Sequence, residues 1–182
     1  FSVNGGLTIA TPLVTAQAGA LTQLVANAGT VTFAALPGGT GQPVATSNGA
    51  TLSVSAQSIV QGTTINLPSG VIAFTAQNGI TLQAGSVTNV AGAVTPFFDV
   101  VRIAPAGSVT LQTANGDVAV ASGAVVDLRG GRLGSVTMPM LDVVDSDQGG
   151  NAGTLTVIAP NGTAHLDGQL LEIGRASCRE RV

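Results

Sequence analysis

The first 98 residues of the chain, from Phe1 to Phe98, contain no Asp, Glu, Lys, Arg or His. A charge-free run of this kind suggests a membrane segment, but a spanning helix needs about 18–20 consecutive apolar residues. Here the apolar residues are interleaved with Thr, Ser, Gln and Asn, as in residues 29–35 (GTVTFAA) and 50–56 (ATLSVSA). Alternation with a period of two is typical of a β-strand that is buried on one face. The sequence therefore predicts an all-β protein that does not span a membrane.

The last ten residues, 173–182 (IGRASCRERV), differ sharply in composition from the rest of the chain. They read, codon by codon, as the translation of a sequencing-library adaptor, and Glu172 is then the junction codon. We therefore expect 172–182 to be a non-native tail and exclude it from the fold prediction. Because no Met and no signal peptide precede the repeats, we expect 1–171 to be an internal fragment of a longer reading frame.

Residues 1–171 contain seven Asp, three Arg and one His, with no Lys, Glu or Cys. Three Arg against seven Asp give a formal net charge of −4. An acidic chain has no electrostatic support for binding nucleic acid. The absence of Cys excludes disulfides and thiolate metal sites from this part of the chain.

A repeat with aligned positions runs through the chain, starting in each case from a small residue. The starting residues are Gly5, Gly29, Ala50, Gly70, Gly107 and Gly153. Large apolar residues stand two and four positions after each starting residue. A hydroxyl residue usually stands three positions after it, and a small residue stands six positions after it. The first apolar position holds Leu7, Val31, Leu52, Ile72, Val109 and Leu155, and the hydroxyl position holds Thr8, Thr32, Ser53, Ala73, Thr110 and Thr156. With a strand period of two, the apolar positions share one face and the hydroxyls the other.

The spacing of the first repeats predicts a β-solenoid with coils of about 20–25 residues, each contributing two or three short strands. We expect second strands at 80–82, 118–120 and 164–166, and third strands at 87–90 and 125–128. Irregular excursions are expected near 91–106 and 130–152. A charged residue repeated at one position would lie next to the same charge in the adjacent coil, and the two would repel each other. Thr, Ser, Asn and Gln at such positions instead form hydrogen-bonded ladders. This explains why charged residues are scarce.

Five Asn-Gly pairs, at 4–5, 48–49, 78–79, 115–116 and 161–162, mark the corners of the coils. We expect them to supply the left-handed backbone of tight turns. Asn-Gly is also a strong signal for a β-hairpin, so an antiparallel β-sandwich is the alternative fold. The solenoid is favoured because small residues recur at one aligned position, which stacking requires and a sandwich does not.

Residues 107–131 (GSVTLQTANGDVAVASGAVVDLRGG) and 148–170 (QGGNAGTLTVIAPNGTAHLDGQL) closely resemble the repeats of filamentous-haemagglutinin-type exoproteins. These large adhesins of Gram-negative bacteria are exported by two-partner secretion and fold as right-handed parallel β-helices. The resemblance implies that 1–171 is one β-helix segment of a secreted, cell-surface shaft, with no enzymatic activity and no cofactor. The implied partners are an outer-membrane transporter during export and host glycans or proteins. The Asn-Pro-Asn motifs of the family's secretion module do not occur here, which places the segment downstream of that module.

Two clusters of ionisable residues are candidates for chemistry. Asp142, Asp145 and Asp147 offer oxygen ligands that suit calcium, but their spacing matches neither an EF-hand nor the calcium-binding β-repeat. A solvated acidic loop, neutralised by Arg129 and Arg132, is the simpler interpretation.

The second cluster is His165 with Asp167, which share a strand face and could pair. Because no nucleophile matches them, we interpret them as a surface contact. We therefore predict no catalytic residue, no metal and no cofactor.

Two other functions are compatible with a solenoid. A β-helix lyase or hydrolase needs clustered carboxylates, yet the first 98 residues carry none. An ice-binding solenoid needs a flat Thr array, and only Thr30/Thr32 and Thr154/Thr156, with Thr51/Ser53 close to the pattern, provide such rows. Both functions remain alternatives to the shaft.

Overall fold

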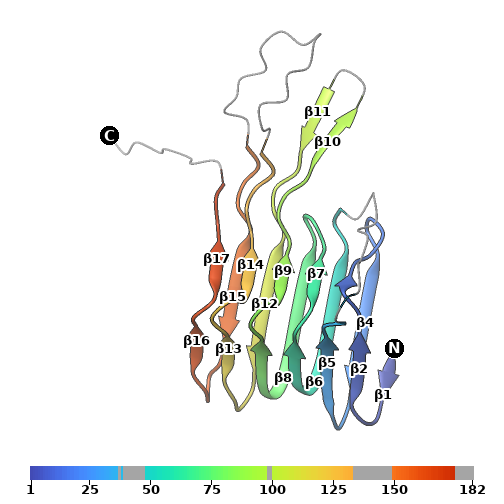
Figure 1. The fold of residues 1–182 in the computed structure, drawn as a ribbon, viewed down its shortest axis with the longest axis vertical. Helices are drawn as coiled ribbons and strands as arrows, with labels where there is room; N and C mark the ends of the chain where they lie inside the picture. The colour runs from blue at the N-terminus through green and yellow to red at the C-terminus, as the bar shows by residue number, and fades with distance from the viewer. Residues whose placement is uncertain (37, 39–47, 98–99, 133–148, 175–182) are drawn as a thin grey trace.

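The computed structural model describes residues 1–36, 38, 48–97, 100–132 and 149–174, and this part of the chain is all β (Figure 1). It contains no helix long and apolar enough to cross a membrane. The strands are β1 (Ser2–Val3), β2 (Leu7–Ala10), β3 (Leu13–Val14), β4 (Leu21–Ala26), β5 (Thr30–Ala34), β6 (Thr51–Gln61), β7 (Thr64–Asn66), β8 (Val71–Leu82), β9 (Val87–Asn89), β10 (Val94–Phe97), β11 (Val100–Ile103), β12 (Ser108–Thr113), β13 (Val118–Val120), β14 (Val125–Asp127), β15 (Thr154–Ile158), β16 (Ala164–Leu166) and β17 (Gln169–Leu171). The predicted second and third strands after residue 80 are confirmed, with the second strand at 80–82 forming the end of β8.

The strands form three columns, which are shared between two parallel sheets. The first column contains β1, β4, the first half of β6, the first half of β8, β12 and β15. The second contains β2, β5, the second halves of β6 and β8, β13 and β16, and belongs to the same 10-stranded sheet. The third is a separate 5-stranded sheet of β3, β7, β9, β14 and β17. We call each passage of the chain through the columns a row, so that the described residues form six rows.

All strand pairs in these two sheets are parallel. Residues 71–82 form the single strand β8, where an antiparallel sandwich would fold them into a hairpin. The antiparallel sandwich is therefore excluded. Among the named strands of the described residues, β10 and β11 alone pair antiparallel, as a hairpin that extends beyond the end of the two sheets (Figure 1). This hairpin lies within 91–106.

The core lies between the two sheets, because one cluster of buried apolar residues draws on both of them. Alternate residues of β6 and β8 point inward, so that Val54, Phe74 and Leu111 lie in register one above the other, each fully buried. The Phe74 ring stacks on that of Phe33, with centroids 6.1 Å apart and an angle of 11° between the planes. Large apolar side chains of the first column thus stack on one another, as the aligned positions predict.

The first two repeats are aligned with each other as predicted, but their predicted alignment with the four later repeats is wrong. Residues 7–10 and 30–34 lie in the second column, where Leu7 pairs with Val31 and Val31 with Ile59. The first column at this end is occupied by β4, in which Thr22 pairs with Leu52. The error arises because strands of both columns alternate large apolar residues with Thr, so that the pattern does not distinguish them.

The predicted reason for the Asn-Gly corners is also wrong for four of the five pairs. Of the five glycines in these Asn-Gly pairs, Gly49 alone has a positive φ, of 75°. Gly116 is required for a different reason, since a Cβ at this position would overlap the backbone oxygen of Asn78 in the row below. Gly162 in turn packs on the backbone of Gly116. These glycines therefore permit close stacking of the corners.

A buried polar network lies near the point where the first and third rows pair in the third column. β3 of the first row pairs directly with β7 of the third row. Nearby, Gln61 is fully buried, and its Nε2 donates to the backbone oxygens of Thr63 and Val87, both at 3.1 Å. Its Oε1 accepts a hydrogen bond of 3.0 Å from the hydroxyl of Thr88, which is also fully buried. A polar side chain is thus tolerated in the core because its hydrogen bonds are made inside it.

Replacing Gln61 with Leu is expected to lower the free energy of unfolding by about 1–3 kcal/mol, because the Thr88 hydroxyl loses its acceptor inside the core. Leucine itself fits the column, since Leu82 pairs with Gln61 in the next row. Urea denaturation followed by circular dichroism measures the change. Adding Thr88→Val should recover part of the loss, because both polar partners are then apolar. A double variant less stable than Gln61→Leu would contradict this account.

Candidate functional site

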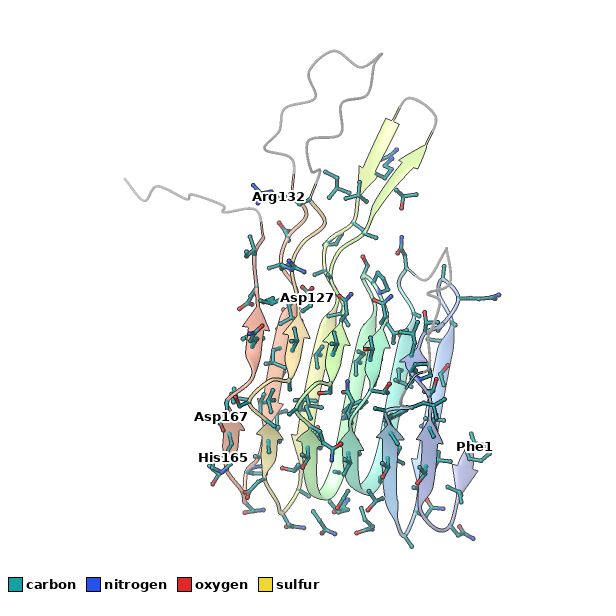
Figure 2. All side chains as sticks on the ribbon, viewed as in Figure 1. Phe1, Asp127, Arg132, His165 and Asp167 are labelled. Atoms are coloured by element: carbon teal, nitrogen blue, oxygen red, sulfur yellow. The ribbon has the colours of Figure 1, made fainter. Side chains whose placement is uncertain are left out.

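The three Arg of residues 1–171 lie around one end of the third column, where the hairpin leaves the sheets. Arg129 follows β14, Arg102 lies in β11, and Arg132 forms an isolated backbone bridge with Gly149. Figure 2 shows Asp127 and Arg132 toward this end, whereas His165 and Asp167 lie toward the other. The Arg side chains of residues 1–171 are thus concentrated where the hairpin leaves the stack.

We call this place the hairpin corner; it comprises residues 91–94, 102–106, 129–132 and 149–151. The Gly92 amide donates to the backbone oxygen of Arg129 at 2.8 Å, and the Ala104 amide donates to Ala93 at the same distance. A Cβ at Gly92 would overlap the backbone of Ala104 and Gly131. The base of the hairpin is therefore held to the rest of the corner by backbone contacts that only glycine allows.

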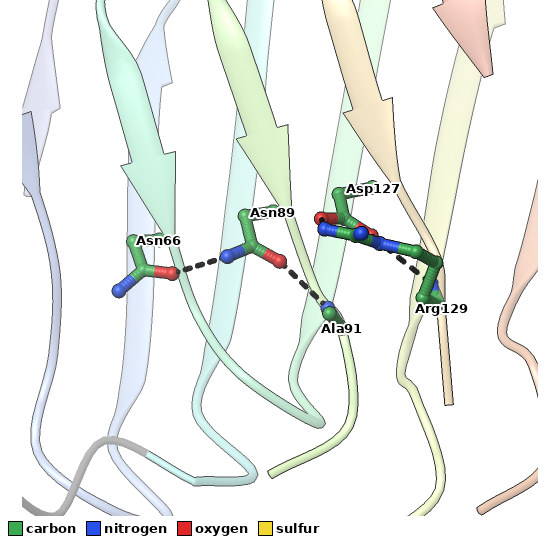
Figure 3. Close-up of polar contacts among 5 residues, drawn as sticks. All are labelled: Asn66, Asn89, Ala91, Asp127 and Arg129. Atoms are coloured by element: carbon green, nitrogen blue, oxygen red, sulfur yellow. Dashed lines mark hydrogen bonds and ion pairs between the residues drawn. The ribbon is translucent and has the colours of Figure 1, made fainter. Parts of the chain in front are cut away.

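A ladder of polar side chains leads up to this corner along the third column (Figure 3). Asn66, Asn89 and Asp127 are paired in register as the last residues of β7, β9 and β14. Asn89 Nδ2 donates to Asn66 Oδ1 at 2.8 Å, and Asn89 Oδ1 accepts from the Ala91 amide at 2.8 Å. Asp127 repeats the second contact, because its Oδ1 accepts from the Arg129 amide at 3.1 Å. The same side-chain turn thus ends two successive third strands.

Asp127 and Arg129 form a bidentate ion pair. Arg129 Nε donates to Asp127 Oδ1 at 2.9 Å, and Arg129 Nη2 donates to Asp127 Oδ2 at 2.5 Å. The Asp127 side chain is 9% exposed and the Arg129 side chain is 49% exposed. Burial raises the pKa of Asp127, but the side-chain hydrogen bonds, the backbone amide and the charge of Arg129 outweigh it, so the pKa lies below its ordinary value. The same hydrogen bonds and charge raise the pKa of Arg129. The pair is charged at neutral pH.

This pair predicts a pH dependence of stability. Because the folded-state pKa of Asp127 is below the unfolded value, its contribution is present above about pH 4 and is lost as the pH falls through the folded pKa. Arg129 is half exposed, so we expect a contribution of about 1 kcal/mol or less. The urea midpoint is measured at about pH 6 and at about pH 3, and the difference between the two values should be smaller in Asp127→Asn than in the unchanged chain. Asparagine keeps the turn, as Asn89 shows, and an equal difference in both proteins would refute the assignment.

The structure does not test the candidate calcium site. Asp142, Asp145 and Asp147 lie outside the described residues, and within the described ranges no group of three His, Cys, Asp or Glu could hold a metal ion. Arg129, which was expected to neutralise that loop, forms an ion pair with Asp127.

His165 and Asp167 are both exposed in the last row. In the described part of the chain, no hydrogen bond or ion pair joins their side chains. Both residues therefore lie on the surface, but the contact considered between them is not formed.

The Thr rows considered for ice binding lie in different columns. Thr30 and Thr32 belong to β5 in the second column, whereas Thr154/Thr156 and Thr51/Ser53 belong to the first. Between the two first-column rows, Thr51 pairs with Val71 and Ser53 with Ala73. No single flat Thr array therefore connects these rows.

The ladder of Asn66, Asn89 and Asp127 was not predicted. Its signal in the sequence is a polar Asx residue that ends three short apolar segments, TIN, VTN and VVD. Because the intervals between these segments are unequal, only the strand register reveals that they are aligned.

Comparison with known proteins adds no functional assignment. No protein-family model, curated protein or solved structure matches the chain. The function must therefore be argued from the residues and their arrangement.

Proposed function

We propose that residues 1–171 are a shaft segment of a large secreted bacterial adhesin of the filamentous-haemagglutinin type, folded as a right-handed parallel β-helix. The observation that carries the proposal is the parallel, in-register pairing that continues from the first row to the sixth. Parallel strands joined within one sheet almost always follow a right-handed path. The resemblance of residues 107–131 and 148–170 to the repeats of this family supports the same proposal.

In this proposal the function is mechanical. Each row adds about 4.8 Å along the stacking direction, so that many rows build a rod that holds a distal binding region away from the cell. The hydroxyl and amide ladders on the outside could add weak, multivalent contacts with host glycans or proteins. An outer-membrane transporter would export the chain to the cell surface, and neither catalysis nor a cofactor is required.

Recovery of the flanking genomic sequence tests the proposal. We expect a longer reading frame that encodes further rows, an upstream secretion module with Asn-Pro-Asn motifs, and a neighbouring gene for an outer-membrane transporter. Electron microscopy of longer segments should show rods whose length grows in proportion to the number of rows. A short, complete reading frame that ends near Leu171 would refute the shaft.

A further inference from the structure

One Asn-x-Thr triplet occurs in the sequence, and it lies at an exposed corner of the stack. Of all the Asn in the chain, Asn161 alone is followed two positions later by Ser or Thr, in Asn161-Gly162-Thr163. An Asn with Ser or Thr at this distance, and no Pro between them, is the acceptor motif for N-linked sugars. All three residues are exposed, in the segment that joins β15 to β16. The acceptor carboxamide is therefore accessible.

The exposure of Asn161 does not depend on its being in the sixth row. Asn78 and Asn115 stand at the same corner, between the first and second columns, in the two preceding rows. Both are exposed, although a row lies on either side of each. Asp117, which occupies the position of Thr163 in the fifth row, is exposed as well. A further row stacked on the sixth would therefore leave this corner open.

We propose that Asn161 is an acceptor for an N-linked sugar, which a glycosyltransferase of the producing cell transfers from a phosphate-activated donor. Asn161 Nδ2 attacks the anomeric carbon of the donor, and the bond from this carbon to the phosphate oxygen breaks. The phosphate leaves together with its carrier, which is a nucleotide or a lipid. One Nδ2 proton passes to a base of the transferase. No group is oxidised or reduced.

The modified side chain fits the folded corner. Asn161 Nδ2 donates to the Ala114 oxygen in the preceding row at 2.9 Å. An N-linked amide keeps one N–H, so this hydrogen bond can remain. The other contact of the triplet with that row runs from the Thr163 amide to Asp117 Oδ1 at 2.7 Å and does not involve the carboxamide. The sugar should therefore project sideways from the rod without separating the rows.

A sugar at this corner supplies hydration that charged residues do not supply in this chain. Like charges repeated in register repel one another, and residues 1–98 carry no charged side chain. Proteins whose surfaces carry little charge tend to associate, whereas an attached sugar is bulky and solubilising without adding charge. The modification would thus keep neighbouring rods apart. This role rests on the proposed function, because it concerns a rod displayed outside the cell.

Two inner corners offer matched controls within the same chain. Asn78 is followed by Gly and Ile80, and Asn115 by Gly and Asp117, so that both share the exposed Asn-Gly pair but lack the hydroxyl. The full chain is produced in one bacterial strain with a soluble N-glycosyltransferase and UDP-glucose, and in another with a lipid-linked oligosaccharide and its transferase. Peptide mapping by mass spectrometry should find a sugar at Asn161, and its mass identifies the donor. The inference is wrong if neither strain modifies Asn161, or if Asn78 or Asn115 is modified equally.

Substitutions at the hydroxyl position complete the test. Thr163→Val should abolish modification of Asn161, and Thr163→Ser should retain it. Asp117→Thr gives Asn115 the same motif in an inner row and should add a second sugar. The urea midpoint of the modified chain should equal that of the unmodified chain. Absence of the second sugar, or a lower midpoint after modification, would show that the corner is not open and would overturn the inference. Neither result bears on the shaft function, which the reading frame tests.

Discussion

Replacing Phe74 with alanine is expected to lower the free energy of unfolding by about 3–5 kcal/mol, because the substitution opens a cavity in the core. The Phe74 side chain has no exposed surface and lies between Val54 and Leu111 in the first column. Its ring also stacks on that of Phe33, and this aromatic contact is lost together with the buried area. Urea denaturation followed by circular dichroism measures the loss.

Phe1→Ala is the matched control for this prediction. The Phe1 side chain is 75% exposed, so the same substitution should change stability by about 0.5 kcal/mol or less. Phe74→Leu, which keeps most of the volume, should cost roughly 1–2 kcal/mol. A loss at Phe74→Ala as small as that at Phe1→Ala would mean that the core is not packed as described.

Replacing Gly116 with alanine is expected to cost about 3 kcal/mol or more, at the upper end of the range for overpacked sites. The added Cβ would overlap the backbone oxygen of Asn78, which cannot move without displacing β8. Backbone yields less readily than the end of a flexible side chain, so the two rows must separate. Loss of stability is again measured by urea denaturation.

Gly5→Ala serves as the comparison, because the same dipeptide, Asn-Gly, stands in the first row at the same corner between the first and second columns. A Cβ at Gly5 meets nothing within 4 Å, so a change of about 0.5 kcal/mol or less is expected. Equal losses of stability in the two variants would show that these glycines are needed for their backbone conformation and not for close stacking. The φ angles argue against this, because neither Gly5 nor Gly116 has a positive φ.

Part of this fold was predictable from the sequence because stacking imposes equal side chains at equal positions. The alternation around Phe74 and Leu111 predicted both the strands and their alignment, and the register confirms it. The same reasoning failed at Val31, because inward residues of the second column look like those of the first. A pattern of period two specifies which face a residue occupies, but it does not specify which column.

The polar features were harder to predict for a related reason. Asn89 and Asp127 are neighbours in the ladder, but the hairpin β10–β11 lies between them in sequence. Gln61 points into the core, and the residue paired with it in the next row is Leu82. Only the three-dimensional arrangement shows which groups form hydrogen bonds with the Gln61 side chain. Insertions such as the β10–β11 hairpin change the sequence spacing without changing the register, and so conceal such partners.

The direct pairing of β3 with β7 has a consequence for the order in which rows can form. Most strands pair with the row before or after them, so that rows can be added one at a time to a folded end. β3 is the exception, because its partner β7 lies two rows later, and Thr63 Oγ1 also donates to the Thr11 oxygen across 52 residues. The first row can therefore not complete its hydrogen bonds until the third has formed. The later rows, by contrast, pair only with their immediate neighbours, so that they can be added one at a time in either direction.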